Sequence, residues 1–401
     1  MSAKQWFNLH SWAGLVVGVL LFVICVSGTL ATLSHEIEYL TDSKYRALSS
    51  SPMTNYPAIE SSLNKHYPNA QVLYIHRHKQ DYLATEVALK INDTFRFVYL
   101  DAASGEVLGE GEWARISRFL RNWHMNLSMG WTGKLIVTSL SILVLILLVS
   151  SFFVYRRWWQ GFLKKPAPLL LHKRNGWADW HKLVGLWSTW FIAVMAVTGL
   201  WYLIEHGLQT AKVDHYVAEP TKVIALKQSA STSNMMPISL TAAYEAAQQA
   251  FPSLDIRYIG YGQKAAQPIE VRGYNNDILL RLRANRVYIN ASTGAVLGIQ
   301  KGQDLPFVPR IKDTADPLHF GNFAGLGTKF IWAIFGSLMS GVSGVGIYMS
   351  WLRVKRKATV SSWLGVSGYI AIGLVIGSVV ITSVSVSERS VPKQLYAPVL
   401  G

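Results

Sequence analysis

The chain has 401 residues, half of them hydrophobic, with 15 tryptophans and a formal net charge of +15 at pH 7. This hydrophobic content is too high for an ordinary soluble protein of this length. The excess of basic residues could indicate a nucleic-acid-binding protein, but these residues gather in short loops between apolar segments, which argues against that class.

Five apolar segments are long enough to cross a membrane as helices. None has a Lys, Arg, Asp or Glu in its interior, and they cover residues 12–34, 135–155, 183–204, 330–352 and 363–384. The loop after the second segment has seven basic residues and one acidic residue, and the loop after the fourth has four basic residues and no acidic one. Short basic loops mark the cytoplasmic side of a membrane. We therefore expect a cytoplasmic N-terminus, with both long inter-helix regions and the tail after the fifth span outside.

The first and third spans share one plan. Residues 9–15 (LHSWAGL) open the first, and residues 180–186 (WHKLVGL) open the third. Both spans have the same residue types at the same distances from the histidine of the motif. Gly and Leu follow it by four and five residues, a hydroxyl residue and a Gly by 17 and 18, and a second His by 25. The matched residues are His10 and His181, Ser27-Gly28 and Thr198-Gly199, and His35 and His206. Because both copies start inside, they are predicted to be parallel repeats about an axis along the membrane normal.

The outer regions repeat as well. Each is predicted to begin with a short amphipathic helix, at residues 57–67 and 240–250, that an aromatic residue and a proline close. Strand-like runs follow at residues 71–76, 83–91 and 95–100 in the first region, and at 256–261, 268–272, 278–283 and 286–289 in the second. Each region is therefore predicted to be a small helix-on-antiparallel-sheet module.

A histidine also precedes the second and fourth spans. His124 lies ten residues before Lys134, and His319 lies ten residues before Lys329. Ten residues of straight helix would lift His124 about 15 Å above the apolar core. Glycines in both segments allow the chain to turn back toward the other helices (Gly130, Gly133, Gly321, Gly325 and Gly327).

Ionisable residues beside a bilayer core are candidates for function, and a neutral imidazole is the usual axial ligand of haem. His10 and His181 lie at the cytoplasmic ends of matched spans, so one haem could sit between them; alternatively, both are interfacial residues like the neighbouring tryptophans. His124 and His319 could bind a second haem near the outer surface, or be hinge residues between module and helix. The single cysteine, Cys25, excludes covalent haem attachment through C-x-x-C-H.

His35 and His206 are ambiguous. They lie 25 residues after His10 and His181, about 37 Å along a straight helix, and therefore at the outer mouth. They could replace His124 or His319 as outer ligands, face a substrate, or be solvated helix ends. Two basic clusters in the modules could hold an anionic chelate or be solvated strand faces (His76, Arg77, His78 and Lys79; Arg272, Arg281, Arg283 and Arg286).

The motifs 9–14, 180–185, 123–127 and 318–322 together resemble the PepSY-associated transmembrane family, over about residues 5–355. These are iron-regulated inner-membrane proteins of bacteria that include di-haem reductases of ferric siderophores. The resemblance implies a membrane α-helical fold: a four-helix transmembrane bundle from two parallel repeats, a fifth peripheral helix, and two small α+β PepSY-like periplasmic modules. It also implies two haem b groups with bis-histidine ligation and reduction of an iron chelate outside the membrane.

The implied domains alternate between membrane and periplasm. Helical spans are expected at 1–35, 123–156, 179–206, 318–352 and 362–386, modules at 36–122 and 207–317, cytoplasmic basic loops at 157–178 and 353–361, and a periplasmic tail at 387–401.

These features favour an enzyme that carries electrons across the inner membrane to a ferric siderophore or similar chelate. Hard oxygen ligands hold Fe(III) far better than Fe(II), so one electron releases the metal. No flavin or nicotinamide fingerprint is present, so the donor is expected to be a cytoplasmic partner or a membrane quinol. The alternative is a non-enzymatic protein that binds a peptide or protein partner through its modules. Membrane lipid is an expected partner and nucleic acid is not.

Overall fold

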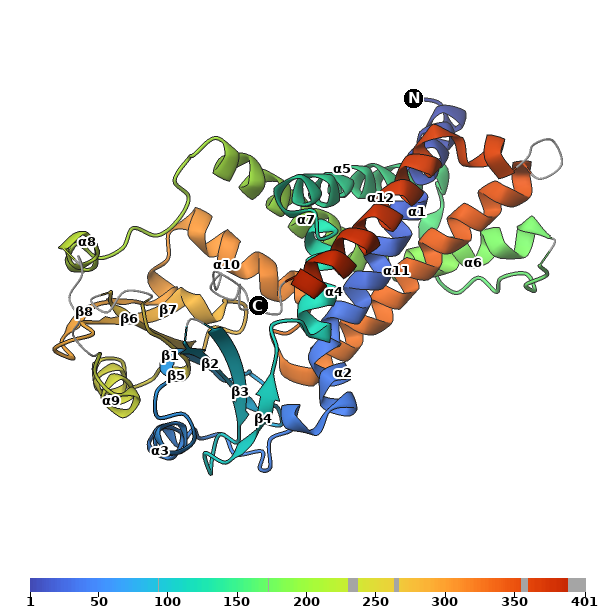
Figure 1. Ribbon diagram of the computed structural model, residues 1–401. Coiled ribbons are helices and arrows are strands. Elements are labelled where there is room, and N and C mark those ends of the chain that lie inside the picture. Colours follow the sequence, from blue (N-terminus) through green and yellow to red (C-terminus); the bar gives the residue numbers. More distant parts are fainter. Residues whose placement is uncertain (93, 172, 230–236, 263–266, 355–359, 389–401) are drawn as a thin grey trace.

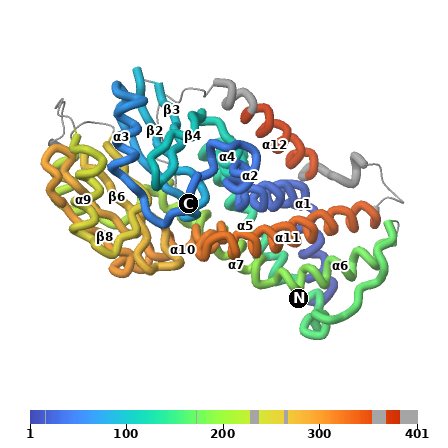
Figure 2. Tube along the Cα trace, turned by 90° about the horizontal axis from the view of Figure 1, so that it is seen from below, coloured from blue at the N-terminus to red at the C-terminus, as the bar shows by residue number. Residues whose placement is uncertain are grey.

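The computed structural model describes residues 1–92, 94–171, 173–229, 237–262, 267–354 and 360–388. It consists of a group of long apolar helices and an antiparallel sheet at one end of that group (Figures 1 and 2). The short helices α4 (Ile116–Asn126) and α10 (Phe307–Phe320) lie between these two parts.

Within the described residues, three helices are long and apolar enough to cross a membrane, and α1 makes four if its two bent halves form one span. These helices are α1 (Ala3–Thr32), α5 (Gly130–Val154), α7 (Thr189–Thr210) and α11 (Gly325–Val354). α1 packs against both α5 and α11, and α5 packs against α7. A multi-pass membrane protein is therefore the class that the helices support.

Two of the predicted spans are interrupted. α1 bends by 61° between Ala3–Leu15 and Val17–Thr32. The predicted third span, residues 183–204, begins later than expected, because α6 (Arg174–Trp187) ends before Ser188 and the membrane-length helix α7 begins after it. The Thr189 hydroxyl donates to the Gly185 carbonyl at 3.0 Å, a back-bond that often bends a helix.

The fifth predicted span coincides with α12 (Val360–Glu388), of which Gly368–Thr382 forms a shorter apolar stretch. Two hydrogen bonds fasten α12 beside the α4–α5 turn. The Trp123 indole donates to Ser378 Oγ at 2.8 Å, and the hydroxyls of Thr382 and Ser128 are hydrogen-bonded to each other at 2.7 Å. The basic residues 355–357 and the tail from residue 389 lie outside the described residues.

The two outer regions share one eight-stranded antiparallel sheet of order β4-β3-β2-β1-β5-β6-β7-β8. The first region contributes α3 (Tyr56–His66), β1 (Gln71–His76), β2 (Thr85–Ile91), β3 (Thr94–Leu100) and β4 (Val107–Gly111). The second contributes α9 (Leu240–Ala250), β5 (Asp255–Gly260), β6 (Ile269–Tyr274), β7 (Asn285–Ile289) and β8 (Val296–Gln300). Strands β1 and β5 join them, with Ile75 opposite Ile259.

One face of the sheet holds a single apolar core beneath α3 and α9, where the Tyr56 and Tyr244 rings stack at 4.6 Å. The predicted strand at residues 278–283 is wrong. Its leucines follow a strand-like alternation, but Leu280 packs on Leu305, and the Arg281 amide donates to the Asp313 carbonyl of α10. The segment therefore packs against and hydrogen-bonds to the region of α10, and a 3-10 turn (Leu282–Ala284) leads from it into β7.

The other face of the sheet looks toward the membrane helices and is fastened to them by buried charges. Burial alone would raise the pKa of Glu86, but Arg115, which precedes α4, and Arg118 of α4 lower it to about 2. Glu38 of α2 (Ser34–Thr41) accepts from the Ser117 amide at 2.7 Å. Loss of either arginine or of the carboxylate would leave an uncompensated buried charge, which is strongly destabilising. Other short elements are α8 (Thr221–Ser229) and the 3-10 turns Ser43–Tyr45, Trp158–Gln160 and Gly302–Asp304.

The predicted turns before the second and fourth spans are confirmed. α4 ends at Asn126, and the chain then turns through Leu127 (φ 50°) and Gly130 (φ 60°) into α5. α10 ends at Phe320 and turns through Gly321 (φ 68°) and Gly325 (φ 75°) into α11. These left-handed conformations suit glycine. They fold each histidine-bearing helix back toward the apolar helices.

Candidate functional site: two histidine pairs

The structure brings His10 of α1 to His181 of α6, with ring centroids 6.5 Å apart and ring planes at 87°. His10 Nδ1 lies 3.0 Å from the buried hydroxyl of Ser150 on α5. That hydroxyl donates to the Leu147 carbonyl at 3.2 Å, so it accepts from His10 Nδ1–H. The lone pair of His10 is thereby left on Nε2. The Nδ1 of His181 is buried and has no hydrogen-bond partner among the described residues.

A second pair forms between His124 of α4 and His319 of α10, with ring centroids 6.1 Å apart and planes at 38°. His124 Nδ1 donates to the Ile24 carbonyl at 2.9 Å, because a carbonyl can only accept. His319 Nδ1 lies 2.8 Å from the Thr198 hydroxyl, which itself donates to the Val194 carbonyl at 2.7 Å. The same reasoning leaves the lone pair of both rings on Nε2.

These two spacings fit a metal bound between each pair. Two imidazoles that ligate one ion from opposite sides have centroids about 6.2 Å apart, from two bonds of about 2.0 Å and two ring radii of about 1.1 Å. Among the described residues, no group of three or more His, Cys, Asp or Glu could hold a metal ion. A two-histidine site suits a metal that brings its own equatorial ligands, as haem iron does.

The hydroxyl residue and glycine that recur in both copies, Ser27-Gly28 and Thr198-Gly199, help to position the outer pair. Ser27 Oγ lies 3.4 Å from His124 Nδ1, and its counterpart Thr198 contacts His319. A Cβ on Gly28 would lie 2.6 Å from His124 Cε1, so only glycine leaves room for this ring. The sequence showed these two residues at the same offset in both copies, and that recurrence was the signal, but no role was assigned to it.

The sequence model of the family described as PepSY-associated TM region matches residues 7–353. The chain belongs to the PepSY-associated transmembrane family. Comparison with curated proteins finds no match. The predicted resemblance is thereby confirmed, as is the coarser class of a membrane protein with several apolar helices and a separate antiparallel sheet.

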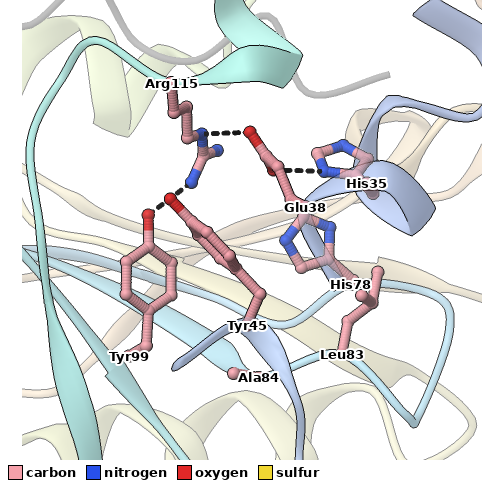
Figure 3. Close-up of a pocket in the computed structure, with 8 residues that line it drawn as sticks. All are labelled: His35, Glu38, Tyr45, His78, Leu83, Ala84, Tyr99 and Arg115. Atoms are coloured by element: carbon pink, nitrogen blue, oxygen red, sulfur yellow. Dashed lines mark hydrogen bonds and ion pairs between the residues drawn. The ribbon is translucent and has the colours of Figure 1, made fainter. Parts of the chain in front are cut away.

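In this PepSY-associated protein, His35 and His206 do not join the outer pair. His35 borders a small pocket with Glu38, Tyr99 and Arg115, where its ring lies 4.6 Å from that of His78 (Figure 3). His206 is 2% exposed and packs on the Trp131 ring at 3.9 Å. The outer pair in this structure therefore consists of His124 and His319.

The two basic clusters are not solvated strand faces. His76 and Arg77 are buried, and burial lowers the pKa of His76 to about 3. The arginines of the second cluster have acidic partners within the protein (Arg272 with Glu270, Arg281 with Asp316 at 2.7 Å, Arg283 with Asp313 at 2.7 Å, and Arg286 with Glu270 at 3.9 Å). These charges fasten the sheet to itself and to α10. They are already compensated, so they are weak candidates for holding an anionic chelate.

A polar network that the sequence did not reveal lies next to His319. The Tyr202 ring of α7 is 5.2 Å from the His319 ring, and its hydroxyl donates to Asp316 Oδ1 at 2.6 Å. Arg281 reaches the same carboxylate. Contacts between elements far apart in the sequence thus hold His319 in place. A separate contact joins α11 to α2, where Lys329 donates to both oxygens of Glu36 at 2.6 Å.

Proposed function

We propose that this protein binds two haem b groups, one between His10 and His181 and one between His124 and His319, and reduces a ferric chelate outside the bacterial inner membrane. The observation that carries the proposal is the presence of two histidine pairs with the spacing of opposed axial ligands, in the two matched positions of each repeat. When bound, haem would supply one-electron redox chemistry that no side chain provides.

The chain's own residues support such ligation in a specific way. A histidine that binds a metal usually donates its other ring N–H to a carbonyl, a carboxylate or water, which fixes the ring and its tautomer. Ile24 does this for His124, and the Ser150 and Thr198 hydroxyls do it for His10 and His319. Cys25 is the only cysteine, so attachment would be non-covalent.

The positions of the pairs suit a conduit across the membrane. His10 and Ile24, which touch the two sites, are 14 residues apart on α1, at most about 21 Å. The inner site contacts the end of α5 at Ser150, and the outer site lies at α4, just before α5 begins. The two sites therefore occupy opposite ends of the same helices.

The direction of transfer follows from the surroundings. The outer pair adjoins the sheet, which we interpret as two PepSY-like modules in the periplasm, and a chelate could dock there. The inner pair adjoins the loop with seven basic residues, which favours a cytoplasmic location. A quinol or an acidic cytoplasmic partner would supply electrons at that side. We interpret the helices as a bundle of two parallel repeats with α12 at its periphery.

A second candidate function has one observation in its favour. Strands β4 and β8 form the two edges of the sheet, and β8 is partly exposed along its length. An exposed edge can add an extended peptide as a further strand. A protein that binds a peptide or protein partner in this way would need no haem.

The purified protein is expected to bind about two haems per chain, both six-coordinate and low-spin. Absorption spectra of the oxidised and dithionite-reduced protein, with haem quantified against protein mass, would measure this. A preparation from haem-replete cells without a Soret band would contradict the proposal and favour the peptide-binding alternative.

Gly28→Ala is expected to weaken haem binding at the outer site by about 10–100-fold, the usual cost of disturbing a ligand's support. The added methyl would displace the His124 ring, while the inner pair is untouched. Haem content and thermal release would measure the effect. Gly207→Ala, where a Cβ meets no atom within 4 Å, is the matched control. Unchanged outer occupancy in Gly28→Ala would argue against His124 as a ligand.

A further inference from the structure

Three arginines follow one another at intervals of three residues, Arg115 just before α4 and Arg118 and Arg121 within it, and they differ in their partners. Arg115 and Arg118 both pair with the buried carboxylate of Glu86. Arg121 makes no hydrogen bond or ion pair with any residue that the structure describes. Its guanidinium carbon lies 5.7 Å from the Phe320 ring centre. Residues three apart on a helix share a face, so Arg121 lies beside His124.

The two copies of the repeat differ in charge at the position that Arg121 occupies. The position three before His124 is Arg121, and the position three before His319 is Asp316. Asp316 is satisfied, because it pairs with Arg281 at 2.7 Å and accepts from Tyr202 at 2.6 Å. The charges of Asp316 and Arg281 offset each other. Asp316 also attracts Arg121, but the ion pair that it forms is with Arg281. The two guanidinium groups therefore share one carboxylate, and a surplus of one positive charge remains beside the outer histidine pair.

An arginine in this position needs an anion. Arg121 is only partly exposed, and burial, with Arg281 nearby, lowers its pKa to about 10. It stays charged at neutral pH, and a charge taken out of water is costly unless it is paired. The planar guanidinium fork matches a carboxylate, which it can bind through two parallel hydrogen bonds.

We infer that Arg121 binds the carboxylate of a haem propionate at the outer histidine site. This inference rests on the proposed function. Arg121 lies one helical turn before His124 and contacts Phe320, the neighbour of His319, so it would be the cationic side chain beside the carboxylates of a haem held by this pair. A resident carboxylate also compensates the charge at all times. A chelate that comes and goes would leave Arg121 unpaired between encounters.

The test is a chemical cycle on the full-length protein in a His181→Ala background, which leaves only the outer site. Arg121 and Arg121→Gln proteins are each loaded with haem b or with its dimethyl ester, which lacks the carboxylates. Transfer of the porphyrin to apomyoglobin is then timed. With haem b, Arg121→Gln should release it about tenfold faster, as expected for loss of one charge-assisted hydrogen-bonded pair. With the diester, both proteins should release it at the same rate.

Arg96→Gln is the control, because Arg96 is exposed on the sheet and paired with Glu110. Should Arg121→Gln fail to accumulate, the unsubstituted background protein still tests the point, since it should lose the diester about tenfold faster than haem b. Equal release of both porphyrins by Arg121 and Arg121→Gln proteins would overturn the inference, and weaker chelate binding by the variant would then assign Arg121 to the substrate. Absence of haem from the wild-type protein would instead overturn the proposed function itself.

Discussion

His10→Ala and His181→Ala are each expected to remove the same single haem and to leave the other in place. The two rings are 6.5 Å apart, at the end of the helices that we propose to be cytoplasmic, so neither would retain a complete axial set without its partner. Each single variant should therefore retain about one of two haems, and so should the double variant. The redox spectrum should keep only the bands of the outer haem.

The measurement is haem content per chain, with reduced-minus-oxidised spectra, for the two single variants and the double variant. His66→Ala is the matched control, because His66 is exposed on α3 and its Nδ1 contacts only the Ser62 carbonyl. If the double variant lost twice as much haem as either single variant, His10 and His181 would serve different sites, and the shared inner site would be excluded.

The histidine pairs could be predicted because an internal repeat can be recognised from the sequence alone. His10 and His181 match in motif and offset, and a pseudo-symmetry axis brings matched residues together. Their contact in the structure agrees with that expectation. The ambiguity of His35 and His206 had a physical origin, since helical length alone cannot tell that α1 ends at Thr32 and that α2 then turns toward the sheet.

Long-range contacts account for most of what the sequence could not reveal. Each module was predicted by itself, whereas β1 and β5 join both into one sheet, a pairing between strands about 180 residues apart. The alternating segment at residues 278–283 follows a strand pattern, but its contacts with α10 prevail over that local preference. The role of Arg121 could not be predicted either, because the sequence does not show that Asp316, the acid near it, pairs with Arg281 instead.

The last prediction concerns the outer pair. His124→Ala or His319→Ala should lower the reduction of an external ferric chelate by at least about a hundredfold, since even disturbing a ligand's supporting residue costs about 10–100-fold. The inner haem should remain and should still be reduced from the inside. The reason is position: His319 packs against the Tyr202 ring of α7, and Tyr202 donates to Asp316, which pairs with Arg281 just before β7. The pair therefore lies where the membrane helices meet the sheet.

Rapid mixing of dithionite-reduced protein with a ferric chelate measures this, with an Fe(II) indicator present and the spectra of both haems followed. Wild-type protein should be reoxidised as Fe(II) appears. The His124→Ala protein should stay reduced at its inner site, and His66→Ala should behave as wild type. If reduced wild-type protein stayed reduced against hydroxamate, catecholate and citrate chelates alike, chelate reduction would be excluded even with both haems bound. Because a haem protein that fails this test could still pass electrons to a partner, the experiment separates the cofactor from its use.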